Sequence, residues 1–349
     1  MMAAVDSFQL LYREIARSCS CYVETLALVG ACYTVSKAVV FMRDCYSLIR
    51  LHFIPRLVCH RDLSQQYGHW AVICGASEAI SKAYAEELAR NGICVILISS
   101  DIRNVADTAK AITETYGVEA ILIEADFSQG PSACKPIKDA ICGKDVGFII
   151  NSLDGSLDLS QDFIDLSEAG VWDIMNRNIV AATLVSHMAL PTMVERGKGA
   201  VVNISMGGCS RPTARKAALS ASTAFLDNFS RALHYEYGHR GIFVQCLLPF
   251  RVAPQRPEGS IAAGWLVPSP QVYASHALST LGVSHRTTGY WPHTIQDHLS
   301  INKYGRLGIS LGFTRQGAVP LHRHWENMDE RSLHLQNLGA GSSGRERMG

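Results

Sequence analysis

Short apolar runs rich in β-branched residues alternate with longer amphipathic segments through the middle of the chain. The run HWAVIC at residues 69–74 and the run CVILIS at residues 94–99 are typical of buried strands, and the segment between them has the length of a helix. Strands that alternate with helices form a parallel sheet covered on both faces. The pattern therefore predicts an α/β fold, a Rossmann-type doubly wound parallel sheet flanked by helices.

The N-terminal 67 residues follow a different pattern. Residues 7–19 place apolar side chains at helical spacing, which predicts an amphipathic helix and hence an N-terminal helical extension. Apolar runs at residues 25–35 and 38–42 are separated by Lys37, and neither reaches the roughly 20 residues that a membrane-spanning helix needs. No small-residue cleavage site follows a basic start, which argues against a secretory signal peptide. Two interpretations stay open here: a helix packed on the main domain, and a membrane-associating or targeting region.

Three regions follow from these patterns. Residues 1–67 form the N-terminal helical membrane or targeting region, residues 68–296 form the main domain, and residues 297–349 form a polar tail. The tail is rich in glycine, serine and mixed charges, a composition typical of a flexible end. His322 and His324 have no second pair of ligands at a fixed spacing, so no metal site is expected.

Composition narrows the class of protein. Of the 349 residues, 48% are hydrophobic and 18% are charged, which is enough to bury a sizeable core. The net charge of +1 gives no electrostatic footprint for nucleic acid, so no nucleic-acid partner is expected. Eleven cysteines form no CxxC pair, and Cys74, Cys94 and Cys246 lie within apolar runs. Reduced, buried thiols are therefore expected rather than a disulfide framework.

A long segment between Val201 and Leu233 carries a family resemblance. Its sequence, VVNISMGGCSRPTARKAALSASTAFLDNFSRAL, predicts a buried strand, a loop and a long helix. With the order of elements from Gly68 to about Gln296, it resembles the steroid-dehydrogenase type of the short-chain dehydrogenase/reductase family. The resemblance implies a catalytic Ser at the strand end, a Tyr thirteen residues later and a Lys four residues after the Tyr. Those positions hold Met206, Leu219 and Thr223.

These replacements remove the proton-transfer chemistry that the resemblance implies. A Tyr with its ordinary pKa is a poor acid at neutral pH, so the family's mechanism needs a Lys one helical turn away to lower that pKa and a Ser to hold the carbonyl. Leu219 neither holds nor gives a proton. Asn178 matches the family's helix Asn, whose backbone helps to seat a proton-relay water, and it alone of the four catalytic positions is retained. We therefore expect a catalytically inactive member of the family; the alternative is an NADP-dependent reductase of steroid or acyl ketones that uses non-standard residues.

The nucleotide loop that the resemblance implies is also altered. The family's TGxxxGxG motif falls on residues 74–81, where Gly75 is the one glycine left of three. Ala79 and Ser81 add side-chain atoms where the family's backbone approaches a pyrophosphate closely or lets the helix and strand pack tightly, so both an empty structural turn and a phosphate-binding loop stay open. After the second strand, NADP-using relatives have an Arg, whereas this chain has Ser100 followed by Asp101.

Two further positions match cofactor contacts of the family. Asp126 corresponds to the residue that approaches the adenine ring, and Asn151 begins a segment that the family writes as NNxG. The glycine of that segment is Asp154 here, an acidic side chain near the expected nicotinamide ribose. No cofactor is expected to bind tightly, and NADP or NAD is expected to bind weakly at most. The candidate cofactor-binding residues are Gly75, Ala76, Asp126 and Asn151.

Helix packing is better preserved than the sites. One apolar stripe runs along the helix that carries Leu219, and it is made of Ala218, Ala221, Phe225, Phe229 and Leu233. Related enzymes dimerise through this helix, so the resemblance implies a homodimer. A further helix is predicted to start at Ser269 and Pro270, which suit the N-cap and the first helical position.

Location and partner follow from the resemblance alone. A steroid-dehydrogenase-type relative is mitochondrial, and others use the N-terminal region as a membrane anchor. We expect residues 1–67 to direct this chain to mitochondria, with the endoplasmic reticulum membrane as the alternative. A binding or scaffolding role then requires a protein partner, which the sequence does not identify.

Overall fold

The computed structural model describes residues 2–58, 62–152, 162–207, 215–253 and 264–298. Residues 1–294 form one compact unit and residues 295–349 form a second. The polar tail predicted at residues 297–349 lies almost entirely outside the described residues, as does Asp154.

In the described part of the chain, parallel strands form a seven-stranded sheet with the order β3-β2-β1-β4-β5-β6-β7. The strand order reverses direction between β1 and β4, which defines a doubly wound fold. The predicted Rossmann-type architecture is confirmed. The strands are β1 (Trp70–Cys74), β2 (Cys94–Ser99), β3 (Ala120–Glu124), β4 (Val146–Ser152), β5 (Gly199–Ile204), β6 (Ile242–Leu247) and β7 (Arg286–Thr287).

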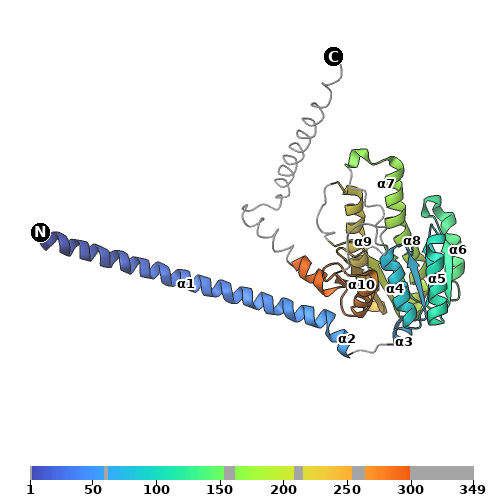
Figure 1. The fold of residues 1–349 in the computed structure, drawn as a ribbon, viewed down its shortest axis with the longest axis horizontal. Helices are drawn as coiled ribbons and strands as arrows, with labels where there is room; N and C mark the ends of the chain where they lie inside the picture. The colour runs from blue at the N-terminus through green and yellow to red at the C-terminus, as the bar shows by residue number, and fades with distance from the viewer. Residues whose placement is uncertain (1, 59–61, 153–161, 208–214, 254–263, 299–349) are drawn as a thin grey trace, which may run out of the picture. The chain divides into compact units, whose positions relative to one another are not determined.

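Helices cover both faces of the sheet (Figure 1). One face is covered by α4 (Ala79–Arg90), α5 (Arg103–Tyr116) and α10 (Pro270–Ser279). The other face is covered by α6 (Cys134–Ile141), α8 (Ala181–Arg196) and α9 (Ala217–Tyr237). Shorter segments connect these elements: η1 (Phe127–Ala133), η3 (Phe163–Asp165), α7 (Glu168–Met175), the π-helix η4 (Asn176–Val180) and η5 (Gly238–Arg240).

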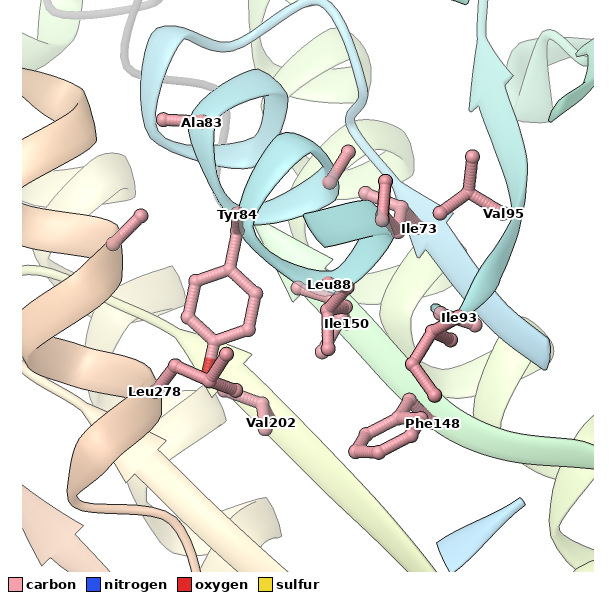
Figure 2. Close-up of a cluster of buried hydrophobic side chains, with 14 of the residues drawn as sticks. Ile73, Ala83, Tyr84, Leu88, Ile93, Val95, Phe148, Ile150, Val202 and Leu278 are labelled. Carbon is pink, nitrogen blue, oxygen red and sulfur yellow. The ribbon is translucent and has the colours of Figure 1, made fainter. Parts of the chain in front are cut away.

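The core follows from strand alternation. Successive strand residues point to opposite faces, so Ile73 of β1 packs under α4 while its neighbour Val72 packs under α8. Figure 2 shows the α4 side, where Tyr84 and Leu88 lie over Phe148 and other strand side chains. Each fully buried aliphatic or aromatic side chain of this kind contributes roughly 1.5–3 kcal/mol.

The N-terminal extension is one continuous helix, α1 (Met2–His52), followed by α2 (Ile54–Val58) and α3 (Leu63–Tyr67). The prediction that Lys37 leaves two segments too short to span a membrane is wrong, because one helix joins them. The Lys37 ammonium lies 5.5 Å from the centre of the Tyr33 ring, one helical turn away, and the helix continues through it. The stretch Tyr22–Leu57, 36 residues, is long and apolar enough to cross a membrane by length and composition, and no residue of its apolar 18-residue window is buried.

Reduced, buried thiols were expected at Cys74, Cys94 and Cys246, and the structure agrees except for the burial of Cys94. Every cysteine whose side chain is described is a free thiol, and Cys74 and Cys246 are buried. Burial raises the pKa of the Cys74 thiol to about 12, so it stays protonated and unreactive. Cys94 is only half-buried, because it is the first residue of its strand.

Candidate functional site

The family's catalytic positions lie where β5 ends against α9. The Ser205 hydroxyl donates to the Thr223 carbonyl over 3.1 Å and joins the two elements. Met206 follows it and is half-buried, whereas Leu219 and Thr223 are 4% and 3% exposed. The Thr223 hydroxyl donates to the Ser220 carbonyl of its own helix over 2.7 Å. The structure thus brings the three predicted positions to one junction, which presents a thioether, an isobutyl group and an engaged hydroxyl.

Ser205 does not replace the missing serine. Its side chain is buried, and its hydroxyl proton is used by the α9 backbone. A carbonyl substrate needs a donor directed at its oxygen, which this hydroxyl does not supply in the arrangement described.

Asn178 lies in the π-helix η4, a feature that sequence reasoning missed. Its side chain is buried, and its Nδ2 atom donates to the Ser222 hydroxyl over 3.3 Å. Ser222 in turn donates to the Leu219 carbonyl over 2.8 Å. Single π turns are common at functional sites. Here the turn holds Asn178 beside the helix that carries Leu219.

A buried amide network below this junction was also missed. The Asn151 Nδ2 atom donates to Ser186 Oγ at 3.0 Å and to Asn203 Oδ1 at 2.8 Å. The Asn203 Nδ2 atom then donates to Ser230 Oγ at 2.8 Å. The network ties β4, β5, α8 and α9 together, which gives Asn151 a structural role. A polar residue inside each of two apolar strand sequences was the available signal.

The retained glycine of the nucleotide loop is required by packing. Gly75 has φ +75°, and a Cβ built on it would lie 2.9 Å from the Ser152 carbonyl oxygen of β4. Ala76 is buried, and its N–H donates to the Ile98 carbonyl over 3.1 Å. Both positions are therefore fixed by the contact of this turn with the neighbouring strands, whether or not a nucleotide binds.

The start of α4 fits a pyrophosphate poorly. Glu78 is the N-cap residue, and its side chain makes no capping hydrogen bond to α4. A helix N-terminus binds phosphate through its free N–H groups and its dipole, and a carboxylate at that end opposes a second anion. Ser81 is fully buried and, among the described residues, its hydroxyl has no partner. Sequence reasoning missed Glu78, although an acidic residue inside the glycine motif was the available signal.

Asp101 and Asp126 also lie at the carboxyl ends of the strands, the edge of the sheet at which α4 begins. Asp126 follows β3, and its Oδ1 atom accepts from the Ser128 N–H over 2.9 Å. Asp101 follows β2, and its N–H donates to the Ser99 hydroxyl over 3.0 Å. A carboxylate after the second strand suits a ribose hydroxyl and opposes a 2′-phosphate. Gly75, Ala76, Asp126 and Asn151, the candidate cofactor-binding residues, lie at the ends of strands β1, β3 and β4 at this edge, and their role in binding stays a prediction.

The apolar stripe predicted on α9 is only partly covered. Ala221 is exposed, and Phe225 and Phe229 are half-buried with their rings stacked 5.5 Å apart. The buried side of α9 includes Leu219, Leu226 and one member of the stripe, Leu233. The homodimer that the resemblance implies for this helix stays a prediction. The predicted start of α10 is confirmed, since Ser269 Oγ accepts from the Val272 N–H over 3.3 Å.

Comparison with known proteins agrees with the resemblance. A family model described as short chain dehydrogenase matches residues 69–258. Inactive hydroxysteroid dehydrogenase-like protein 1 of Danio rerio is 76% identical over 296 residues, which cover 84% of this chain and 93% of that protein. Very-long-chain 3-oxoacyl-CoA reductase of Anas platyrhynchos is 37% identical over 228 residues, covering 65% of this chain and 73% of the relative.

A solved structure described as 7beta-hydroxysteroid dehydrogenase superimposes with a TM-score of 0.61 at 25% identity, covering 70% of this chain and 94% of that one. The name of the Danio rerio relative contains the word inactive, in agreement with the predicted loss of catalysis. The chain belongs to the short-chain dehydrogenase family.

Proposed function

We propose that this protein is a non-catalytic short-chain dehydrogenase that acts as a binding or scaffolding protein at the mitochondrial membrane. The observation that carries the first part is the burial of Leu219 and Thr223 at the β5–α9 junction. A positioned acid contributes about 10²- to 10⁴-fold to rate, and a donor on the developing oxyanion adds a comparable factor. The described residues of the junction offer neither group, so the relay water that the resemblance assigns to Asn178 has no acid to serve.

Turnover measurements test this part. We expect the full chain, with NADPH and either a ketosteroid or a 3-oxoacyl-CoA, to consume no NADPH above background. Leu219→Tyr alone is expected to stay silent, because catalytic groups that act as a unit gain little from one member. Turnover by the unmodified chain that disappears in Asn178→Ala would contradict the proposal, since different residues of this pocket would then be doing chemistry.

A second candidate, an NADP-dependent reductase of steroid or acyl ketones, is favoured by one observation. The chain is 37% identical to a protein named very-long-chain 3-oxoacyl-CoA reductase, and it keeps Asn178 in a π-helix. The same turnover assay decides between the two candidates.

Membrane attachment is the second part of the proposal, and α1 supports it. Along the Tyr22–Leu57 stretch, apolar side chains are exposed on every side of the helix, which suits a lipid environment better than a packed one. Its charged residues are partly compensated, since Lys37 lies over Tyr33 and Arg43 pairs with Asp44 at 3.4 Å.

A targeting experiment tests the location. We expect residues 1–67 to send a fluorescent reporter to mitochondria, with the endoplasmic reticulum as the alternative. A diffuse cytosolic reporter would contradict the proposal.

The proposal extends to ligands and partners. NADP or NAD binds weakly at most, because Glu78 and Asp101 place carboxylates at the phosphate edge of the sheet. The partly exposed Phe225 and Phe229 on α9 suit a homodimer. A separate protein partner would make this a scaffold, and chemical cross-linking in isolated mitochondria would detect either assembly.

A further inference from the structure

Two segments far apart in the sequence expose apolar side chains close to the end of α1. After α1, Phe53, Ile54 and Leu57 are exposed, and Leu57 reaches 85%. Before α10, Trp265 and Leu266 are exposed, with Trp265 at 58%. We call these five residues the Trp265 patch. Exposed side chains of this size on adjoining segments mark a contact surface rather than scattered single residues.

Trp291 joins the two halves of the Trp265 patch. Its ring centre lies 6.1 Å from that of Phe53 and 5.4 Å from that of Trp265. The Tyr290 hydroxyl donates to the Trp265 carbonyl over 3.2 Å and fixes that backbone. The patch is therefore one continuous aromatic and aliphatic surface.

Polar contacts hold α2 against α10 beside the patch. Arg56 donates from Nε to Ser279 Oγ at 3.3 Å, and its Nη1 atom lies 3.0 Å from His276 Nε2. Just before α2, His52 Nε2 lies 2.9 Å from Thr294 Oγ1. These contacts make the end of α1 a docked joint rather than a loose tether.

We propose that the Trp265 patch lies in the headgroup layer of the membrane that α1 enters. This inference rests on the membrane attachment proposed above. Phe53, Ile54 and Leu57 of the patch belong to the apolar Tyr22–Leu57 stretch, and Trp265 and the neighbouring Arg56 are residue types favoured at the lipid–water interface. A lipid surface covers both the exposed helix and the patch.

The length of the helical stretch supports the same placement. The part of the stretch that lies in α1, Tyr22–His52, spans about 46 Å, whereas the hydrocarbon core is about 30 Å thick and the whole bilayer about 40–45 Å. A stretch that is too long is accommodated by tilting. Tilting leaves the Leu57 end in the headgroup layer and brings the joined patch down to it.

Quenching of tryptophan fluorescence tests the inference. The full chain is reconstituted in phosphatidylcholine vesicles whose acyl chains carry bromine close to the headgroup, and emission is compared with that in unbrominated vesicles. We expect bromine to quench the wild-type protein, and Trp265→Phe to lower that quenching about twofold because an interfacial indole has been removed. Trp172, which is 61% exposed on α7, supplies the matched control, and Trp172→Phe is expected to leave the bromine-dependent loss unchanged.

The outcomes separate this inference from the attachment on which it rests. Resistance to alkaline carbonate extraction together with equal quenching in both variants would overturn the inference and keep α1 as an anchor. Release of the wild-type chain by carbonate would overturn the attachment itself. A loss of dimer mass on Trp265→Asp, with Trp265→Phe leaving the quenching unchanged, would assign the patch to a second copy of the chain and would also overturn the inference.

Discussion

The core on the α4 side of the sheet and the β5–α9 junction differ in what their residues have retained. In the core, Phe148, Tyr84 and their neighbours fill the space between strands and helices as any member of this fold requires (Figure 2). At the junction, Leu219 and Thr223 fill space as well, in positions where the family places reacting groups. Packing constrains a buried position whatever its chemistry, so the fold persists when the reaction does not.

The loop at residues 74–81 shows the same contrast between positions that packing constrains and positions that it does not. Gly75 is retained where a side chain would collide with β4, whereas the glycine positions at Ala79 and Ser81 have been filled. The glycine that packing requires is thus retained in this turn.

The largest expected effect is the loss of stability when a large side chain of the core is truncated. Phe148→Ala is expected to lower the free energy of unfolding by about 3–5 kcal/mol, because it removes a fully buried ring that packs edge-on against Tyr67 at 5.3 Å. Denaturant unfolding of the full chain in detergent measures this loss. Phe148→Leu is the control and is expected to lose less. A loss below about 1 kcal/mol for Phe148→Ala would show that this core does not hold the domain.

Restoring the family residue at the junction is expected to cost stability. Leu219 is buried, so Leu219→Tyr overfills the space and is expected to lower the free energy of unfolding by about 1–3 kcal/mol. Met206→Ser, at the half-buried position nearby, is the matched control and is expected to change it by less than about 1 kcal/mol. If Leu219→Tyr were as stable as the parent, room for a catalytic tyrosine would have been preserved, and the contrast between core and junction would fail.

Two buried tyrosines of the core differ in the hydrogen bonding of their hydroxyl groups. The Tyr273 hydroxyl donates to the Thr288 carbonyl over 3.0 Å, so Tyr273→Phe is expected to cost about 1 kcal/mol. The Tyr84 hydroxyl is buried without a partner among the described residues, so Tyr84→Phe is expected to be neutral or stabilising. Thermal unfolding of both variants measures the difference, and equal losses would show that Tyr84 has a partner, such as an ordered water.

Periodic apolar patterns predicted the strands, the doubly wound sheet and the start of α10, because burial leaves a direct mark on sequence. The same patterns gave no sign that Ser222 and Thr223 of α9 are buried, since neither side chain is apolar. They also missed the bond between Asn151 and Asn203, which lie 52 positions apart. The partner of a buried polar side chain is set by distant segments, and single-sequence patterns carry no record of it.

A calorimetric titration of NADPH, and separately of NADH, into the folded full chain tests most directly whether the nucleotide site has been lost while the fold is kept. We expect dissociation constants weaker than roughly 100 μM, which correspond to a binding free energy smaller than about 6 kcal/mol. Ala79→Gly combined with Ser81→Gly is predicted to tighten binding, because it restores the two filled glycine positions. Micromolar affinity of the unmodified chain for NADPH would contradict the claim that the fold has outlasted its site.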